Sequence, residues 1–109
     1  MKTDRELLEM AAKAASIVGR FIERMPEDGY PCYTCGIGGA NSFILWNPLT
    51  DDGDALRLAV KLKLNIMFSG GFHHVGADRF VLDICRSGDI SELRWGIVYS
   101  SAEIGKAMP

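Results

Sequence analysis

The sequence predicts an α+β fold in which about three helices cover both faces of a small, mostly antiparallel sheet, as an alpha-beta-alpha (α-β-α) sandwich. Three observations predict it: three segments with helical apolar spacing, several short apolar runs bounded by glycine or proline, and a length of 109 residues with no linker between domains. At this length about two thirds of the unfolded chain's surface can be buried. Residues 1–109 should therefore form a single domain whose core needs neither a metal nor a disulfide.

The first helix is predicted over residues 4–18, because apolar residues recur there at helical spacing opposite a polar stripe. The apolar positions are Leu7, Ala11, Ala14 and Val18. Thr3 and Glu6 fit a capping box at its start, and Gly19 suits the left-handed residue that commonly ends a helix. Its alanines should allow close packing against a sheet or another helix.

Charged residues delimit the second helix. Thr50 can accept a hydrogen bond from the free amides of a first turn, and the helix then runs on to Lys61 and Lys63. Aspartates favour the positive end of this helix and lysines its negative end. The apolar stripe is formed by Leu56, Ala59 and Val60.

The third helix is predicted over residues 89–106, where apolar residues again recur near helical spacing. Asp89 and Glu92 can cap its start. Gly96 lies inside it and costs roughly 1 kcal/mol relative to alanine. This cost weakens the helix without excluding it.

Short strands are predicted at residues 20–25, 42–46, 66–68 and 80–84. The segment 42–46 is apolar on both faces, which suits a central strand covered on both sides. The segments 66–68 and 80–84 should form a hairpin through residues 70–76, whose glycines favour a turn. The glycine-rich stretch 36–41 is interpreted as a flexible connection that could contact a small ligand or a partner.

The charge balance excludes some classes of partner. Lys and Arg number 12 against 14 Asp and Glu, which gives a net charge of −2, and no run of basic residues occurs. Nucleic-acid binding through Arg79, Arg86, Arg94 and nearby lysines is therefore a minor hypothesis. No apolar run approaches the length that spans a bilayer, no apolar leader follows Met1, and three cysteines are an odd number. We expect a cytoplasmic protein with reduced thiols and no membrane contact.

Three segments carry a family resemblance: the block W-N-P-L-T-D-D-G-D-A-L-R-L-A-V-K-L at residues 46–62, the opening residues 4–15 and the closing residues 102–108. They resemble a family of short phage and prophage proteins of unassigned function. The resemblance implies a phage-encoded accessory protein with an α-β-α sandwich fold, acting in the cytoplasm of the bacterial host, and it implies no reaction. Residues between Met25 and Ser42 have no counterpart in that family, and nothing is carried over to the hairpin around His73 and His74.

A C-x-x-C sequence is the sharpest local feature. Cys32 and Cys35, followed by Gly36, can present two thiolates to one tetrahedral zinc ion. Cys85 and either His73 or His74 could complete a Cys₃His set. A redox dithiol is the weaker alternative, because its first cysteine belongs at the amino end of a helix and a glycine-rich stretch follows here. A third interpretation treats the cysteines as buried apolar residues.

Other constellations have simpler explanations. Asp51, Asp52 and Asp54 lack the calcium-loop pattern, and helix capping accounts for them. His73 and His74 could take part in acid–base chemistry, but no paired nucleophile is recognisable, and a solvated hairpin tip is the preferred interpretation. No catalytic residue is assigned.

Two functions from different classes remain. The first is a non-enzymatic phage accessory protein that binds a host or phage macromolecule or a small signal, in an anti-defence role or another, alone or as a homo-oligomer. Its candidate contact surfaces are the loop at residues 32–41 and the histidine hairpin. The alternative is a structural or hydrolytic zinc protein that uses Cys32, Cys35, Cys85 and His73 or His74 and holds about one zinc ion per chain.

Overall fold

Three helices and six short strands make up the part of the chain that the computed structural model describes, namely residues 3–23, 35–38, 45–69, 72–77, 82–87 and 89–108. In chain order they are α1 (Asp4–Ala14), β1 (Arg20–Glu23), β2 (Cys35–Gly38), β3 (Leu45–Trp46), α2 (Asp52–Lys61), β4 (Asn65–Ser69), β5 (Phe72–Ala77), β6 (Leu82–Ser87) and α3 (Ile90–Ala107). This is an α+β fold with three helices and small antiparallel sheets, which confirms the predicted class.

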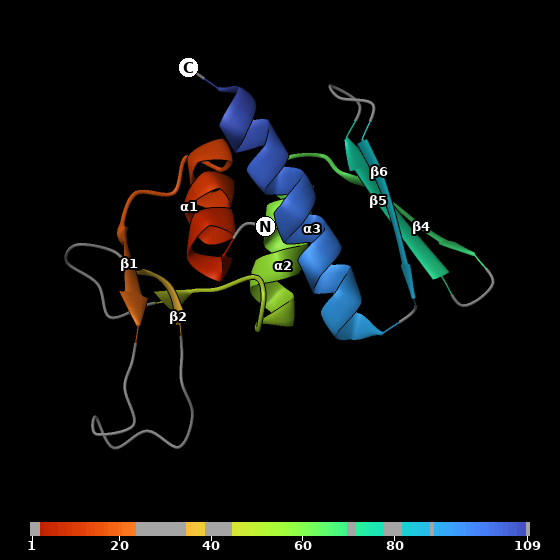
Figure 1. Cartoon of the computed structure of the whole chain (residues 1–109), viewed down its shortest axis with the longest axis horizontal. Coiled ribbons are helices and arrows are strands. Elements are labelled where there is room, and N and C mark those ends of the chain that lie inside the picture. Colours follow the sequence, from red (N-terminus) through yellow and green to blue (C-terminus); the bar gives the residue numbers. More distant parts are fainter. Residues whose placement is uncertain are drawn as a thin grey trace.

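The strands form two sheets, where the sequence predicted one. Each sheet has three antiparallel strands in chain order, β1-β2-β3 in the first and β4-β5-β6 in the second. The helices lie between the two sheets (Figure 1). Short connections favour pairing between successive strands, and the insertion of α2 between β3 and β4 separates the two groups. The sheets are therefore the outer layers and the helices the middle one, which differs from the predicted order of helices on both faces of one sheet.

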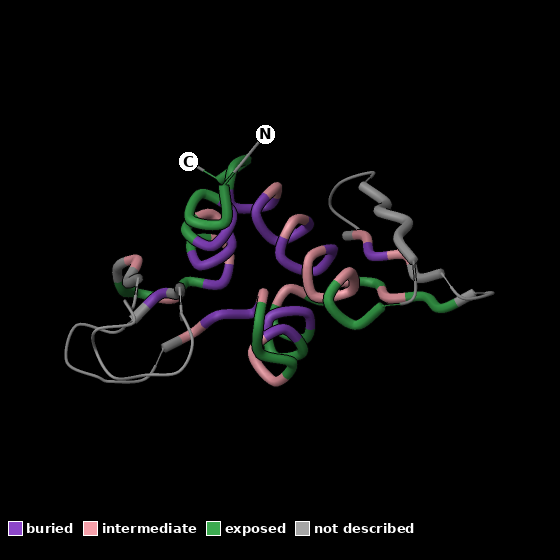
Figure 2. The backbone as a smooth tube through the Cα atoms, turned by 60° about the horizontal axis from the view of Figure 1, so that its bottom comes forward, coloured by how far each residue is buried: buried purple, intermediate pink, exposed green. Residues whose placement is uncertain are grey.

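The core is centred on the crossing of α1 and α3. Leu8, Ala11, Val98 and Ala102 are fully buried there, and Figure 2 shows that buried residues follow the sides on which the helices face one another. The backbones approach most closely at Gly105, where a Cβ atom would lie 2.8 Å from the carbonyl carbon of Met10. Small residues at this crossing allow the approach, as the alanine-rich face of the first helix predicts.

Two serines of α3 lie in this core, and their hydroxyl groups differ in hydrogen bonding. The Ser101 hydroxyl donates to the carbonyl oxygen of Ile97 at 2.7 Å. The Ser100 hydroxyl is also buried, and among the described residues it has no hydrogen-bond partner. A buried hydroxyl without a partner lowers stability because it has given up its hydrogen bonds to water.

The N-terminal caps of the helices are confirmed, except that the cap of α2 lies one residue further along the chain than predicted. Thr3 accepts a hydrogen bond from the Glu6 amide at 3.2 Å, and Asp89 accepts one from the Ser91 amide at 3.0 Å. At α2 the cap is Asp51, which accepts from the Asp54 amide at 2.8 Å. The prediction of Thr50 as this cap is wrong by one residue, because the Asp51 carboxylate reaches the first-turn amide.

The helix ends differ from the prediction. Helix α1 ends at Ala14, not at residue 18, and its left-handed residue is Ser16, with φ of 58°, in place of Gly19. The amide of Ile17 returns to the carbonyl oxygen of Ala12 at 2.9 Å, which is the hydrogen bond of a Schellman motif. Helix α2 ends in the same way, with Lys63 at φ of 54°. In both helices an apolar residue follows this turn and packs on the core. Its burial stabilises the turn, although the left-handed residue is not glycine.

The second sheet corrects the predicted hairpin. Residues 72–77 form a strand of their own, β5, between β4 and β6, so residues 70–76 are more than a turn. Val75 of β5 is fully buried, and its side chain lies beside Gly96 of α3. The contact of Val75 with α3 joins segments that are distant in sequence, and the glycines that predicted a turn contain no sign of it.

The first sheet corrects two further predictions. Residues 36–38 of the glycine-rich stretch belong to β2, the central strand of this sheet, whereas the sequence predicts a flexible connection there. Ile37 fixes this strand by packing in the core. Of the predicted central strand 42–46, residues 45–46 form β3 at the sheet edge, and residues 42–44 lie outside the described part of the chain.

Candidate functional site

The predicted zinc ligands are distributed over both sides of the fold. Cys35 begins β2 in the first sheet, whereas His73 and Cys85 lie on β5 and β6 of the second sheet. The helices separate these two sheets (Figure 1). Cys32 lies outside the described residues. Within the described residues, no group of three or more His, Cys, Asp or Glu is placed to hold a metal ion.

The histidines do not lie at a hairpin tip. Both belong to β5, where the backbones of His73 and Arg86 are register partners, as are those of His74 and Cys85. The predicted tip was wrong because β5 continues the sheet. Of the predicted contact loop at residues 32–41, residues 35–38 are β2 and the remainder lies outside the described part of the chain.

The three aspartates near α2 hold the local structure together. Asp51 caps the helix, and Asp54 accepts hydrogen bonds from the Asn47 amide at 2.9 Å and from Arg57 at 2.7 Å. Asp52 pairs with Arg94 of α3. Helix capping therefore accounts for Asp51, whereas Asp52 and Asp54 have other partners than the predicted capping amides.

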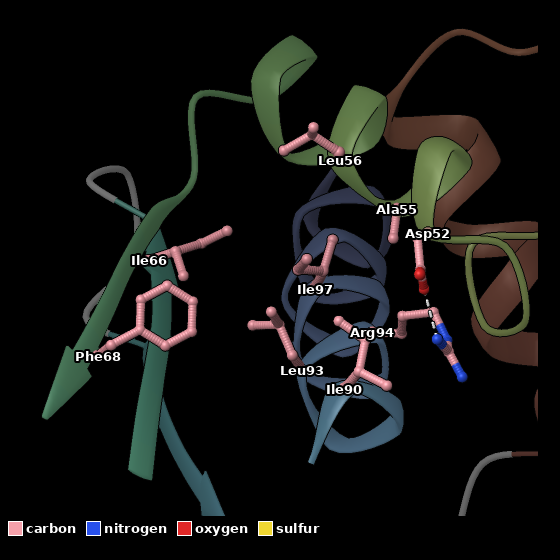
Figure 3. A pocket seen from close by; sticks show the side chains of 9 residues that line it. All are labelled: Asp52, Ala55, Leu56, Ile66, Phe68, Ile90, Leu93, Arg94 and Ile97. Atoms are coloured by element: carbon pink, nitrogen blue, oxygen red, sulfur yellow. Dashed lines mark hydrogen bonds and ion pairs between the residues drawn. The ribbon is translucent and has the colours of Figure 1, made fainter. Parts of the chain in front are cut away.

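An apolar groove between α2, β4 and α3 is the most distinctive surface feature (Figure 3). Its volume is about 330 Å³. Its walls are formed by Ala55 and Leu56 of α2, Ile66 and Phe68 of β4, and Ile90, Leu93 and Ile97 of α3, with Asp52 and Arg94 at one end. The apolar groove is therefore assembled from three elements that are distant in sequence.

Large apolar side chains in this groove remain exposed to solvent. Phe68 is 71% exposed, Leu56 62% and Ile90 52%. Figure 3 shows Ile66 and Phe68 reaching from β4 toward α3. Solvent-exposed apolar residues are ordinary when scattered, but their convergence in one concave surface marks a binding site.

The groove stays open because of how the second sheet is attached. Of the second sheet, the strands that pack on helix α3 are mainly β5 and β6, and β4 extends beyond that contact. Helix α2 packs against α3 from the other direction through Ala55, Leu58 and Ala59, all buried. The space between α2 and β4 consequently has apolar walls that do not meet.

A polar clamp closes one end of the groove. The Arg94 guanidinium donates to the carbonyl oxygen of Leu49 at 2.9 Å and also pairs with the Asp52 carboxylate. These contacts fix α3 to the start of α2. Nearby, hydrogen bonds from the amide and hydroxyl of Ser91 lower the pKa of Asp89, and the positive charge of Arg94 adds to the effect.

The apolar pattern of α2 predicts the wrong buried side chains at one wall of the groove. Leu56 and Val60 were assigned to the apolar stripe that α2 buries, yet both are exposed, and the buried positions are Ala55, Leu58 and Ala59. The helix has apolar residues on two faces, so periodicity alone does not decide which face packs. A second apolar face on a short surface helix is itself the signal that could have indicated the site.

Comparisons with known proteins add no relative. No family model, curated protein or solved structure matches this chain. None of the helices in the described residues is long and apolar enough to cross a membrane.

Proposed function

We propose that this protein is a non-enzymatic binding module whose apolar groove receives an apolar segment of a partner protein. The observation that carries this proposal is the convergence of exposed Leu56, Phe68 and Ile90 in one concave surface. Filling the groove would remove these side chains from water, which supplies roughly 25 cal/mol for each Å² of apolar surface buried.

A protein segment suits the groove better than a small polar ligand. Polar groups at the groove are confined to Asp52 and Arg94, which already pair with each other, so few directed donors or acceptors face the cavity. A volume of about 330 Å³ is at the lower end for small-molecule sites. The exposed apolar surface also continues onto Val60 of α2, outside the groove. An apolar segment of a protein would cover both.

The resemblance to short phage proteins supports a role as a phage accessory protein. Its partner would then be a host or phage protein, and an anti-defence action would consist of covering a surface that the host system needs. Such an action requires binding and no chemical step, in keeping with the absence of an assigned nucleophile or acid–base pair in the sequence.

The test compares a groove variant with a matched surface variant. Leu56→Lys places a charge in the groove at an exposed position, and Val18→Lys makes the same change at a position that does not line it. Partners captured from a bacterial host lysate are purified, and their dissociation constants are measured with wild-type protein and both variants. A thermal melt of each variant shows that the fold is retained.

We expect Leu56→Lys to weaken binding at least about tenfold, because a lysine in an apolar interface loses its hydration. Val18→Lys should bind like the wild type. A partner that binds Leu56→Lys as tightly as the wild type, or the recovery of no specific partner at all, would contradict the proposal.

A further inference from the structure

The outer edge of the second sheet is the feature from which the inference starts. The strand order is β4-β5-β6, and within the described residues β5 is the strand that pairs with β4. The other long edge of β4 faces away from β5, at the side of the molecule most distant from α1 (Figure 1). An exposed strand edge is a template for pairing with another strand.

Strand β4 lacks the devices that normally protect such an edge. Its sequence, Asn65-Ile66-Met67-Phe68-Ser69, contains no charge and no proline, either of which would oppose pairing. Met67 is 63% exposed although it sits at the centre of the strand. It does not line the groove, whereas Ile66 and Phe68 do, which places Met67 on the opposite face of the sheet.

The sequence of β4 is also complementary to itself when two copies run antiparallel. With a two-fold axis at Met67, Ile66 opposes the partner's Phe68, and Met67 opposes the partner's Met67. The polar residues at the two ends, Asn65 and Ser69, likewise oppose each other. Apolar cross-strand pairs stabilise a sheet, and this register forms them on both faces.

We propose that β4 pairs with β4 of a second copy of this chain, so that the two three-stranded sheets become one continuous six-stranded sheet. A second copy is favoured over an unrelated peptide because this strand supplies its own matching partner, and because a two-fold pairing closes on itself without forming fibres. Only five residues on each side pair. The interface is consequently small, and we expect association at high protein concentration.

This inference does not depend on the groove. Met67 is the residue on the symmetry axis, and it lies outside the groove wall. A variant at Met67 therefore tests the pairing, and Leu56→Lys tests partner binding. Either proposal can fail while the other holds.

The test uses the charge of residue 67 in the full chain. Sedimentation equilibrium is measured from about 1 µM to about 1 mM, the range in which weak dimers dissociate, for wild-type protein, Met67→Lys, Met67→Glu and the control Val18→Lys. A thermal melt of each protein confirms folding, which an exposed position should permit.

The wild type and Val18→Lys should form dimers at the upper concentrations. Met67→Lys and Met67→Glu should each associate at least about tenfold more weakly, because like charges oppose each other at the axis. An equal mixture of the two should recover the dimer, since opposite charges then meet. A wild type that stays monomeric throughout, a Met67→Lys protein that dimerises normally, or a mixture that stays monomeric would overturn the proposed pairing.

Discussion

Replacing Gly105 by alanine should separate the two central helices. The added Cβ would lie 2.8 Å from the carbonyl carbon of Met10, and it would overlap the carbonyl oxygen as well. Ordinary contacts begin at 3.4 Å, so the carbonyl carbon alone requires the backbones to move apart by about 0.6 Å, and the nearer carbonyl oxygen requires more. No side-chain rotation can relieve this overlap, because the obstacle is backbone. A gap of this size removes about a quarter of the dispersion energy along the crossing.

The expected magnitude is the difference between two terms. Overpacking of a tight core costs about 1–3 kcal/mol, and a backbone obstacle belongs at the upper end. Alanine regains at most about 1 kcal/mol over glycine in a helix. The net loss should be about 2 kcal/mol, which lowers Tm by about 8–10 °C in a domain of this size.

Urea and thermal unfolding followed by circular dichroism would measure this loss. The matched control is Gly53→Ala in α2, where the new Cβ would meet side-chain ends rather than backbone, at 3.1 Å for Arg57 and 3.2 Å for the Asp51 carboxylate. These side-chain ends can move aside, so the control should keep or slightly raise the stability of the protein. A Gly105→Ala protein as stable as the wild type would refute the close crossing of α1 and α3.

Three further outcomes can be measured. Ser100→Ala should raise the free energy of unfolding by about 1 kcal/mol, because it removes a buried hydroxyl without a partner among the described residues. Ser101→Ala should lower the free energy of unfolding, because it removes the hydrogen bond to Ile97. Equal effects of the two substitutions in urea titrations would contradict both predictions. Because the pKa of Asp89 is lowered, its carboxylate stabilises the folded protein at pH values above the ordinary pKa of 3.8, and this stabilisation is lost as the pH falls through the lowered pKa. Asp89→Asn should keep the cap but flatten the dependence of Tm on acid pH. An acid profile that does not change would exclude this role of Asp89. The zinc hypothesis for Cys32 and Cys35 predicts about one zinc ion per chain by elemental mass spectrometry and a lower Tm after chelation; a metal-free protein with an unchanged melt would exclude it.

Local signals in the sequence predicted the elements that depend on local interactions. All three helices form, and two of their caps, Thr3 and Asp89, are the predicted residues. The side-chain oxygen and the amide that it accepts from are only two or three residues apart, so the sequence contains the whole interaction. The α+β class followed from the same elements.

Long-range placement could not be predicted in the same way. Whether β5 is a turn or a strand depends on Val75 meeting Gly96 of α3, a contact between segments that the sequence places far apart. Which face of α2 is buried depends on α3 in the same way. Ala55 and Leu56 are adjacent in sequence and each fits an apolar helical pattern, so the pattern does not decide which of them is buried. A local C-x-x-C spacing similarly leaves the positions of distant ligands undetermined.

The open groove and the unprotected strand edge have one structural origin. Close packing of α1 on α3 gives the core its density through small side chains, and β5 covers the opposite side of α3 with Val75. Once α3 is occupied on both sides, β4 extends past it, and Met67 and Phe68 remain largely exposed to solvent while Ile66 packs against the core. Charged residues on such a strand would oppose its pairing with another chain, and β4 has none. The exposed Met67 and Phe68 connect the two proposed associations, a partner protein at the groove face and a second copy of the chain at the strand edge.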